Sequence, residues 1–295
     1  MTCIPVQRRH RIERPRRSLL FTPATRAQSF AKSMHSGADI VCVDLEDSVP
    51  PDQKEAARTP AVAFLTGPEH ATAQRALRIN GLGTRAGHVD LLAVLDAAPR
   101  HGGLLLPKVG HAEEIRRVDA LLSEAGSPVE IYALIETMEG LENAGAIAAA
   151  SGRLRMLVFG AVDLSAEMGS DLSDAALAYP RGRIVQAGRR HGLDVMDVPS
   201  LDFRNTQAVA AAASAARAQG FTGKASIHPV TLEAINAAFT PDATEVARAR
   251  AVIAAFRAAP NGLAVLDGQL IEAPVIKAME KLLAVADRAG VECDE

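Results

Sequence analysis

Short, continuously apolar runs recur along the chain, and longer stretches with a helical spacing of apolar residues separate them. Continuous apolar runs, in contrast to alternating ones, are typical of strands that are covered on both faces in a parallel sheet. We therefore predict eight buried strands, which lie at residues 17–23, 39–47, 76–80, 103–108, 130–136, 155–160, 194–198 and 224–229.

Helical patterns fill the intervals between these strands. Residues 24–37, 111–126 and 206–220 are the clearest, and the last two end in glycine, a common helix stop. Eight strands alternating with helices over about 210 residues fit a (β/α)8 TIM barrel better than an open doubly wound sheet. No G-x-G-x-x-G follows an early strand and no G-x-x-x-x-G-K-[ST] occurs, so nucleotide-binding folds lose their main support.

The chain continues beyond the predicted barrel. Residues 240–262 have the pattern of a capped helix, and residues 273–290 that of a final helix. We therefore divide the chain into a barrel with an N-terminal arm, residues 1–230, and a C-terminal extension, residues 231–295.

A β-hairpin is predicted between these two helices, at residues 261–274. Its turn is Asp267-Gly268, because Asp-Gly is a preferred two-residue hairpin turn. Spacing alone therefore makes Asp267 a turn residue and gives no reason to consider it catalytic.

Composition and charge argue against two classes of partner. The 295 residues are 48% hydrophobic, which allows one large core. A formal charge of −3 and a pI near 6.3 provide no electrostatic case for nucleic-acid binding. No apolar run approaches the roughly 18–20 residues of a membrane span, and the N-terminus lacks the apolar region of a secretory signal.

Cysteine usage and the basic N-terminus complete this picture. Cys3, Cys42 and Cys293 show neither C-x-x-C spacing nor an even number, so we expect neither zinc nor disulfides and assign the chain to the cytoplasm. The arginines within residues 7–17 are interpreted as a solvated arm, with the exception of Arg17.

Polar residues fall at the C-terminal end of one predicted strand after another. Barrel enzymes place their chemistry on that rim, so these side chains are expected to share a polar pocket. They are Asp44, Glu46, Asp47, Arg78, Asn80, Lys108, Glu136, Asp163, Asp197 and His228.

Two of these acids, Glu136 and Asp163, follow consecutive strands. Hard oxygen ligands with few His or Cys neighbours favour Mg²⁺ or Mn²⁺, with water or substrate at the other positions. The alternative is that each acid caps the helix that follows it. Two acids on adjacent strand ends favour the metal site.

The cations of the rim are fewer. Arg78 would be costly at a buried strand end without a partner, so it needs a carboxylate or an anionic ligand such as a substrate carboxylate or an enolate. Lys108 could form a Schiff base or pair with the acids. We favour the ion pair, because the acids already provide for a metal-based electrophile.

Eight short motifs occur in an order that is similar to one known family. They are RRSLLFTPA, VDLEDSVPPDQKEAAR, LRIN, LLPK, ALIET, VFGAVDL, ASIHP and AVLDGQLIEAP, spread over about residues 16–285. In this respect the chain resembles the citrate lyase β-subunit-like proteins of the HpcH/HpaI aldolase superfamily, which include malyl-CoA and citramalyl-CoA lyases.

The resemblance implies a Mg²⁺-dependent TIM barrel that cleaves or forms a carbon–carbon bond in a 3-hydroxyacyl-CoA thioester. The products of cleavage are acetyl-CoA, or a homologue, and a 2-oxo acid. It also implies a homo-oligomer, a trimer or a pair of trimers, whose C-terminal extension is swapped between subunits.

The roles implied for single residues follow from the matching motifs. Glu136 and Asp163 resemble the metal ligands, and Glu136 would also contact the substrate. Glu46 and Asp47 resemble acids that hold water at the metal. The remaining assignments are Arg17 and Arg78 for the oxo-acid carboxylate and the developing enolate, and Asp267 for the acid/base supplied by a neighbouring subunit.

Two departures from the family pattern bear on the substrate. Pro23-Ala24 replaces the usual Pro-Gly, and MDVPSLDF around Pro199 replaces a more usual Asp-Gly pair. Alternative functions are the β subunit of a citrate lyase that acts on a citryl-acyl carrier protein, an acyl-CoA thioesterase, an aldolase without CoA, or a non-catalytic subunit.

Overall fold

The computed structural model describes residues 14–259 and 263–291. It divides into two compact units: a barrel unit, Arg16–Phe239, and a second unit that includes the described residues from Thr240 onward. Most of the predicted N-terminal arm, together with Cys3 and Cys293, lies outside the described residues.

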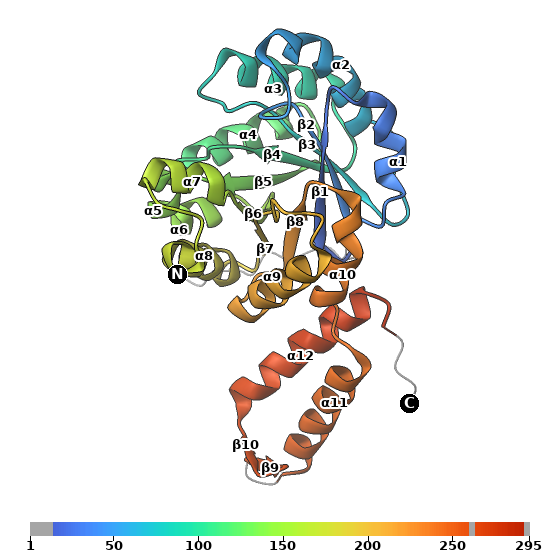
Figure 1. Ribbon diagram of the computed structural model, residues 1–295, viewed down its shortest axis with the longest axis vertical. Coiled ribbons are helices and arrows are strands. Elements are labelled where there is room, and N and C mark those ends of the chain that lie inside the picture. Colours follow the sequence, from blue (N-terminus) through green and yellow to red (C-terminus); the bar gives the residue numbers. More distant parts are fainter. Residues whose placement is uncertain (1–13, 260–262, 292–295) are drawn as a thin grey trace. The chain divides into compact units, whose positions relative to one another are not determined.

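Eight parallel strands form a closed barrel in the first unit, with each strand beside its neighbours in sequence and the first beside the last (Figure 1). The predicted TIM barrel is therefore confirmed. The strands are β1 (Ser18–Pro23), β2 (Ile40–Asp44), β3 (Gln74–Arg78), β4 (Gly103–Leu106), β5 (Glu130–Ile135), β6 (Leu154–Phe159), β7 (Asp194–Asp197) and β8 (Gly223–Ser226).

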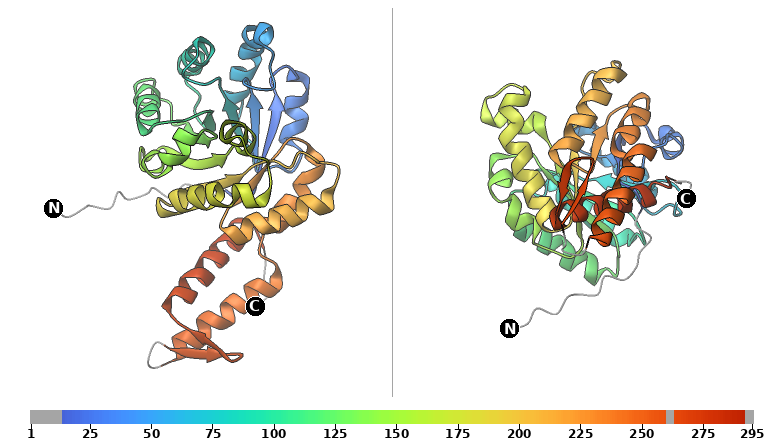
Figure 2. Two further views of the ribbon diagram at one scale, coloured as in Figure 1. Left: turned by 60° about the vertical axis from the view of Figure 1, so that its left-hand side comes forward. Right: turned by 90° about the horizontal axis from the view of Figure 1, so that it is seen from below.

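Helices surround the strands in each view of the barrel (Figure 2). They are α1 (Phe30–Met34), α2 (Lys54–Leu65), α3 (Arg85–Ala97), α4 (Ala112–Glu124), α5 (Met138–Glu142), α6 (Ala144–Ala148), α7 (Ala161–Met168), α8 (Asp174–Arg190), α9 (Thr206–Gln219) and α10 (Leu232–Phe239). Single 3₁₀ turns are η1 (Ala27–Ser29), η2 (Pro51–Gln53) and η3 (Pro229–Thr231).

Helix ends follow the predicted signals in two cases and depart from them in a third. Gly220 ends α9 with a φ of 100°, and Gly126 lies beyond α4 with a φ of 66°, so both glycines adopt the backbone expected of helix stops. The helix expected over residues 24–37 is shorter: only η1 and α1 form there.

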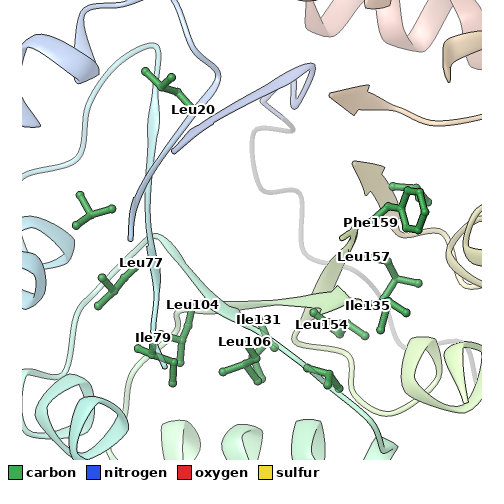
Figure 3. Close-up of a cluster of buried hydrophobic side chains, with 14 of the residues drawn as sticks. Leu20, Leu77, Ile79, Leu104, Leu106, Ile131, Ile135, Leu154, Leu157 and Phe159 are labelled. Atoms are coloured by element: carbon green, nitrogen blue, oxygen red, sulfur yellow. The ribbon is translucent and has the colours of Figure 1, made fainter. Parts of the chain in front are cut away.

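Both faces of the barrel strands are buried, which explains why their sequences are continuously apolar. Val41 and Val43 of β2 join a large cluster that also contains helix residues, whereas Ile40 and Cys42 join a separate cluster formed by alternate strand positions. Figure 3 shows part of the larger cluster. Every residue of β2 is buried, including the terminal Asp44.

The boundary between barrel and extension differs from the one expected at residue 231. Leu232, Ile235 and Phe239 of α10 are buried in the large barrel cluster, and α10 packs against α9 and β8. Their burial assigns α10 to the barrel unit, which ends at Phe239.

The second unit has the predicted order of elements: α11 (Ala243–Ala258), β9 (Ala264–Leu266), β10 (Gln269–Ile271) and α12 (Ala273–Arg288). The strands are antiparallel, and Asp267 and Gly268 form the turn with φ angles of 51° and 73°. Positive φ at both positions is the geometry that Asp-Gly accommodates best. No helix of the described residues is long and apolar enough to cross a membrane.

Candidate active site

A pocket of about 500 Å³ opens at the carboxyl ends of the barrel strands. One part of its wall is charged and contains Asp44, Asp47, Arg78, Glu136 and Asp163. The rest is mainly apolar and includes Phe21, Val158, Phe159, Val198, Pro199 and Ile227. Most of the acids predicted from the strand ends therefore meet in one place, beside an apolar surface.

Asp44 organises the acidic loop after β2. Its carboxylate accepts the backbone N–H groups of Glu46 at 2.9 Å and Ser48 at 3.2 Å. These bonds turn the chain, so β2 ends at Asp44 and not at residue 47 as expected. Lys54 of α2 secures the same loop by donating to the carbonyl oxygens of Leu45 and Glu46.

Arg78, at the end of β3, carries the positive charge that this acidic loop requires. Its Nε and Nη2 donate to the two oxygens of Asp44 at 2.6 and 2.7 Å. Its Nη1 lies 3.0 Å from Glu46 Oε2 and 3.2 Å from Asp47 Oδ2. The guanidinium also lies over the Phe21 ring, 4.9 Å from its centroid. Arg78 therefore has carboxylate partners, and only Nη1 is directed away from Asp44.

The acids of the loop respond differently to this cation. Burial opposes ionisation of Asp44, but the hydrogen bonds and charge of Arg78 outweigh it and lower the pKa of that carboxyl group. For Glu46 burial prevails, and its pKa is raised despite Arg78 and Lys108. Glu46 Oε2 is buried and, within the described part of the chain, accepts no hydrogen bond, although it lies at ion-pair distance from Arg78.

Lys108 contacts three acids of the site. Its backbone N–H donates to Glu136 Oε1 at 2.9 Å, and its Nζ lies 2.7 Å from Glu46 Oε1 and 3.5 Å from Asp163 Oδ2. Burial alone would lower the pKa of the Lys108 ammonium. The hydrogen bond and the negative charge of Glu46 outweigh burial, so the pKa is raised above its ordinary value. A Schiff-base lysine needs a neutral amine, and this environment therefore favours the ion pair.

Glu136 lies directly after β5 and is almost fully buried. Burial, followed by the negative charges of Glu46 and Asp163, raises the pKa of its carboxyl group to about 8. Gly160 provides the space that Glu136 occupies, because a Cβ at Gly160 would lie 2.4 Å from Glu136 Cβ.

The alternative that Glu136 and Asp163 are helix caps is wrong. The hydroxyl of Thr137 caps α5 by accepting the N–H of Gly140 at 3.0 Å. Asp163 is the third residue of α7, which begins at Ala161. Both carboxylates are therefore available to a ligand in the pocket.

The donor set fits a divalent cation. Among the residues that the structure describes, five acids (Asp44, Glu46, Asp47, Glu136 and Asp163) contact two cations, Arg78 and Lys108, which leaves three negative charges when all are ionised. Across residues 14–259 and 263–291, no group of three or more His, Cys, Asp or Glu side chains is arranged to hold a metal ion. A site with two protein carboxylates, completed by water and substrate oxygens, is the arrangement that Mg²⁺ commonly adopts.

Residues 17–229 match the sequence profile of the HpcH/HpaI aldolase/citrate lyase family. The chain belongs to this family. The enzyme class and the family expected from the sequence motifs are therefore confirmed.

Two curated relatives in this family come from Cereibacter sphaeroides. A (3S)-malyl-CoA thioesterase is 35% identical over 278 residues, covering 92% of this chain and 95% of the relative. An L-malyl-CoA/beta-methylmalyl-CoA lyase is 32% identical over 303 residues, covering 93% and 95%. The two names describe different reactions on the same kind of thioester.

Solved structures of the family agree with the barrel. CitE from Mycobacterium tuberculosis, in complex with magnesium, acetoacetate and coenzyme A, has a TM-score of 0.78 and 30% identity, covering 92% of this chain and 98% of the other. RipC from Yersinia pestis is 38% identical with a TM-score of 0.68, covering 78% and 97%.

Arg17 does not belong to the pocket of this family member, and the structure does not support a substrate-binding role for it. It precedes β1 and therefore lies at the amino end of the barrel, opposite the pocket. There its backbone N–H and its guanidinium donate to Asp39 at 2.7–2.9 Å. The direction of β1 is the physical reason for this correction.

Three other residues of the expected rim have structural roles. Asn80 bonds with Asp90 and Lys54. His228 stacks on Phe203 with 4.7 Å between ring centroids and caps η3. Asp197 is the third, and its partners are described next.

Asp197 forms a buried charge cluster that the sequence did not reveal. Lys224, which is 2% exposed, donates to Asp197 Oδ2 at 2.8 Å and to the carbonyl of Val198 at 2.7 Å. Arg181 of α8 lies 3.3 Å from Asp197 Oδ1. Lys224 thus secures the start of the loop whose Val198 and Pro199 line the pocket.

Asp267 is in the second unit, at the turn of the β9–β10 hairpin. Its side chain is exposed, and the neighbouring Val265 and Leu270 are 68% and 56% exposed. The turn geometry is as predicted, and the catalytic role implied by the family motif stays a prediction.

Proposed function

We propose that the protein is a Mg²⁺-dependent carbon–carbon lyase that cleaves, or in reverse forms, a 3-hydroxyacyl-CoA thioester with a carboxylate next to the hydroxyl group. The observation that carries this proposal is the pair Glu136 and Asp163, which face a pocket whose acids outnumber its cations. The pocket also presents an apolar wall that suits the carbon skeleton of a short acyl group.

Glu136 and Asp163 would hold the divalent cation. When bound, the cation polarises the hydroxyl and carboxylate oxygens of the substrate as a Lewis acid. Arg78 Nη1 would donate to a substrate carboxylate or an enolate oxygen, because Nε and Nη2 are held by Asp44 at 2.6 and 2.7 Å, whereas Nη1 donates to the more exposed Asp47 at 3.2 Å. Glu46 and Asp47 flank this donor and hold it in position.

Cleavage transfers one proton from oxygen to carbon overall. The hydroxyl proton passes to water, from which the Asp267 carboxylate is protonated, the hydroxyl carbon becomes the carbonyl of a 2-oxo acid, and the bond to the thioester α-carbon breaks. Its electron pair forms a thioester enolate, which needs positive groups nearby. Asp267 then protonates the enolate carbon to give acetyl-CoA or a homologue, and in condensation it removes that proton.

Asp267 is proposed to act from a neighbouring subunit of a homo-oligomer, a trimer or a pair of trimers. The exposed apolar residues beside it, Val265 and Leu270, suit burial against another protein surface. Short acyl-CoA thioesters and oxo acids are water-soluble metabolites, and a cytoplasmic location is proposed with them.

A second candidate function is hydrolysis of the same thioester. It is favoured by the 35% identity to the (3S)-malyl-CoA thioesterase. In that reaction water adds to the thioester carbonyl and the C–S bond breaks, which yields free CoA and the intact hydroxy acid. A citrate lyase β-subunit activity on a carrier-protein thioester remains a further prediction, since solved relatives include a citrate lyase beta subunit from M. tuberculosis complexed with oxaloacetate and magnesium.

The deciding experiment is mass spectrometry of the products from malyl-CoA, citramalyl-CoA and citryl-CoA, each incubated with Mg²⁺ and with EDTA. Mg²⁺-dependent acetyl-CoA together with an oxo acid supports the lyase and identifies its substrate. Free CoA with an intact hydroxy acid supports the thioesterase. Glu136→Gln is the matched control and should be inactive. If the wild type also turns over none of the three thioesters, the proposal for free CoA esters is overturned.

A further inference from the structure

Lys108 contacts the acids of the site through two different groups. The backbone N–H donates to Glu136 Oε1 at 2.9 Å, while the side-chain ammonium reaches Glu46 Oε1 at 2.7 Å and Asp163 Oδ2 at 3.5 Å. Lys108 therefore contacts both proposed metal ligands and also Glu46.

The backbone of Lys108 has an unusual conformation that makes these contacts possible. Its φ of 53° lies in the left-handed region, which non-glycine residues adopt rarely and at a cost. Glycine would adopt this φ without cost, but the chain has a lysine at this position. A strained residue in contact with proposed ligands indicates that its position serves the site.

Arg78 and Lys108, which both contact acids of the site, differ in how firmly they are held. The Arg78 side chain is 10% exposed and is held on both oxygens of Asp44. The Lys108 side chain is 46% exposed, and its ammonium can turn into solvent on a flexible stem. Lys108 is therefore the cation whose own charge stays solvated when it releases its acids, and the buried Glu46 keeps its 3.0 Å contact with Arg78 Nη1.

We propose that Lys108 is a positioning residue that sets the metal affinity of the site: its backbone N–H orients Glu136, and its ammonium competes with the divalent cation for Glu46 and Asp163. This inference rests on the proposed function, because it needs the metal site. It adds a residue that binds neither metal nor substrate but determines how tightly the metal is held.

Competition between the two cations has a measurable consequence. When a divalent cation binds, the Lys108 ammonium either moves away from Asp163 or stays beside the metal. Moving away breaks an ion pair, and staying places two positive charges close together, so both outcomes weaken metal binding. Replacing Lys108 with an uncharged side chain of similar length should therefore tighten Mg²⁺ binding by about tenfold, while an arginine should keep the affinity near that of the wild type.

The test is isothermal titration calorimetry, in which Mg²⁺ is added to the full-length protein without substrate and the Kd for Mg²⁺ is measured. The variants are Lys108→Met, which removes the charge, Lys108→Arg, which keeps it, and Lys32→Met, which removes an exposed lysine of α1 as a matched control. We expect a roughly tenfold lower Kd for Lys108→Met and a Kd within twofold of wild type for the other two.

Thermal unfolding supplies a second readout. Lys108→Met should lower Tm more in EDTA than in saturating Mg²⁺, because the metal replaces the missing positive charge. Lys108→Gly also removes the ammonium and suits the left-handed backbone, so it should unfold at a higher temperature than Lys108→Ala. It takes the place of Lys108→Met if that variant does not fold.

Two results would overturn the inference, and they differ from failure of the proposed function. If Lys108→Met or Lys108→Gly binds Mg²⁺ with the same Kd as the wild type or a higher one, the ammonium does not compete with the metal. That result would leave the lyase proposal intact. Absence of Mg²⁺ binding by the wild-type protein would overturn the metal site itself, and the role of Lys108 with it.

Discussion

Asp44 and Arg78 are direct partners in the pairing of β2 with β3, and their side chains join through two hydrogen bonds of 2.6 and 2.7 Å. The acid thereby fixes the plane of the guanidinium. It also leaves Nη1 as the donor that reaches Glu46, Asp47 and the pocket. A buried ion pair with matched geometry thus orients an arginine that lines the charged wall.

Arg78→Lys should lower kcat/KM by about 10²-fold, because lysine cannot hold Asp44 with a two-pronged fork and also offer a fixed donor to the substrate. Steady-state kinetics on the thioester identified by mass spectrometry would measure this. The Kd for Mg²⁺ should change far less than kcat/KM. Wild-type kinetics in Arg78→Lys would show that the guanidinium does not contact the substrate.

The ion pair also predicts a pH-dependent loss of stability. The pKa of Asp44 is lowered in the folded protein from its ordinary value of 3.8, so its ionised form stabilises the fold. This contribution is present above about pH 4 and is lost as the pH falls through the lowered pKa. Asp44→Asn should therefore be destabilised by about 3 kcal/mol at pH 7, a difference that shrinks below about pH 4.

Urea unfolding at pH 7, 5, 4 and 3 would measure this difference. Asp96→Asn, at an exposed position of α3, is the matched control and should be nearly neutral throughout. A constant difference between wild type and Asp44→Asn across these pH values would show that ionisation of Asp44 does not stabilise the fold.

Much of the barrel was predictable because burial on both faces leaves a continuous apolar signature in each strand. The rim acids were also predictable, since consecutive parallel strands bring their carboxyl ends together. Glu136 and Asp163 were found in this way, and the structure places both in the pocket wall.

The features that the sequence did not predict depend on the direction of a strand or on partners that are distant in sequence. Arg17 matched a family motif, but it precedes β1 and pairs with Asp39 at the other end of the barrel. Lys224 stands among small residues in β8, and nothing local indicates that it is buried with Asp197, 27 positions away in sequence. A strand pattern shows which residues are buried without showing which charges meet.

Gly160 is expected to tolerate no side chain, because of its contact with Glu136. A Cβ there would lie 2.4 Å from Glu136 Cβ and 2.7 Å from Glu136 Oε2. Gly160→Ala should therefore displace the carboxylate, weaken Mg²⁺ binding by at least about tenfold and cost about 1–3 kcal/mol of stability. Titration calorimetry and thermal unfolding would measure both effects.

Gly152→Ala is the control for this substitution. Gly152 is exposed, and a Cβ there would have no heavy atom within 4 Å. It should bind Mg²⁺ as the wild type does. Normal Mg²⁺ affinity in Gly160→Ala would instead mean that Glu136 does not need its present position to bind the metal.

The proposed action of Asp267 from a neighbouring subunit predicts complementation between two inactive variants. Glu136→Gln disables the barrel site, and Asp267→Asn disables the hairpin. In a mixed oligomer, a site that combines the intact barrel of one chain with the intact hairpin of the other regains both groups. Random assortment of equal amounts gives this combination in about one quarter of all sites, and every mixed cyclic trimer contains it at one site in three, so about a third of wild-type activity should return in purified mixed trimers.

Co-expression with two different affinity tags and sequential purification would isolate the mixed oligomers. Each variant purified alone provides the background, and the double variant Glu136→Gln/Asp267→Asn mixed with wild type tests for dilution effects. If Asp267 served the barrel of its own chain, every site would lack one of the two groups, and doubly tagged oligomers would stay inactive. Complementation thus separates a hairpin that acts between subunits from one that acts within a subunit, because only the first can assemble an intact site from two damaged chains.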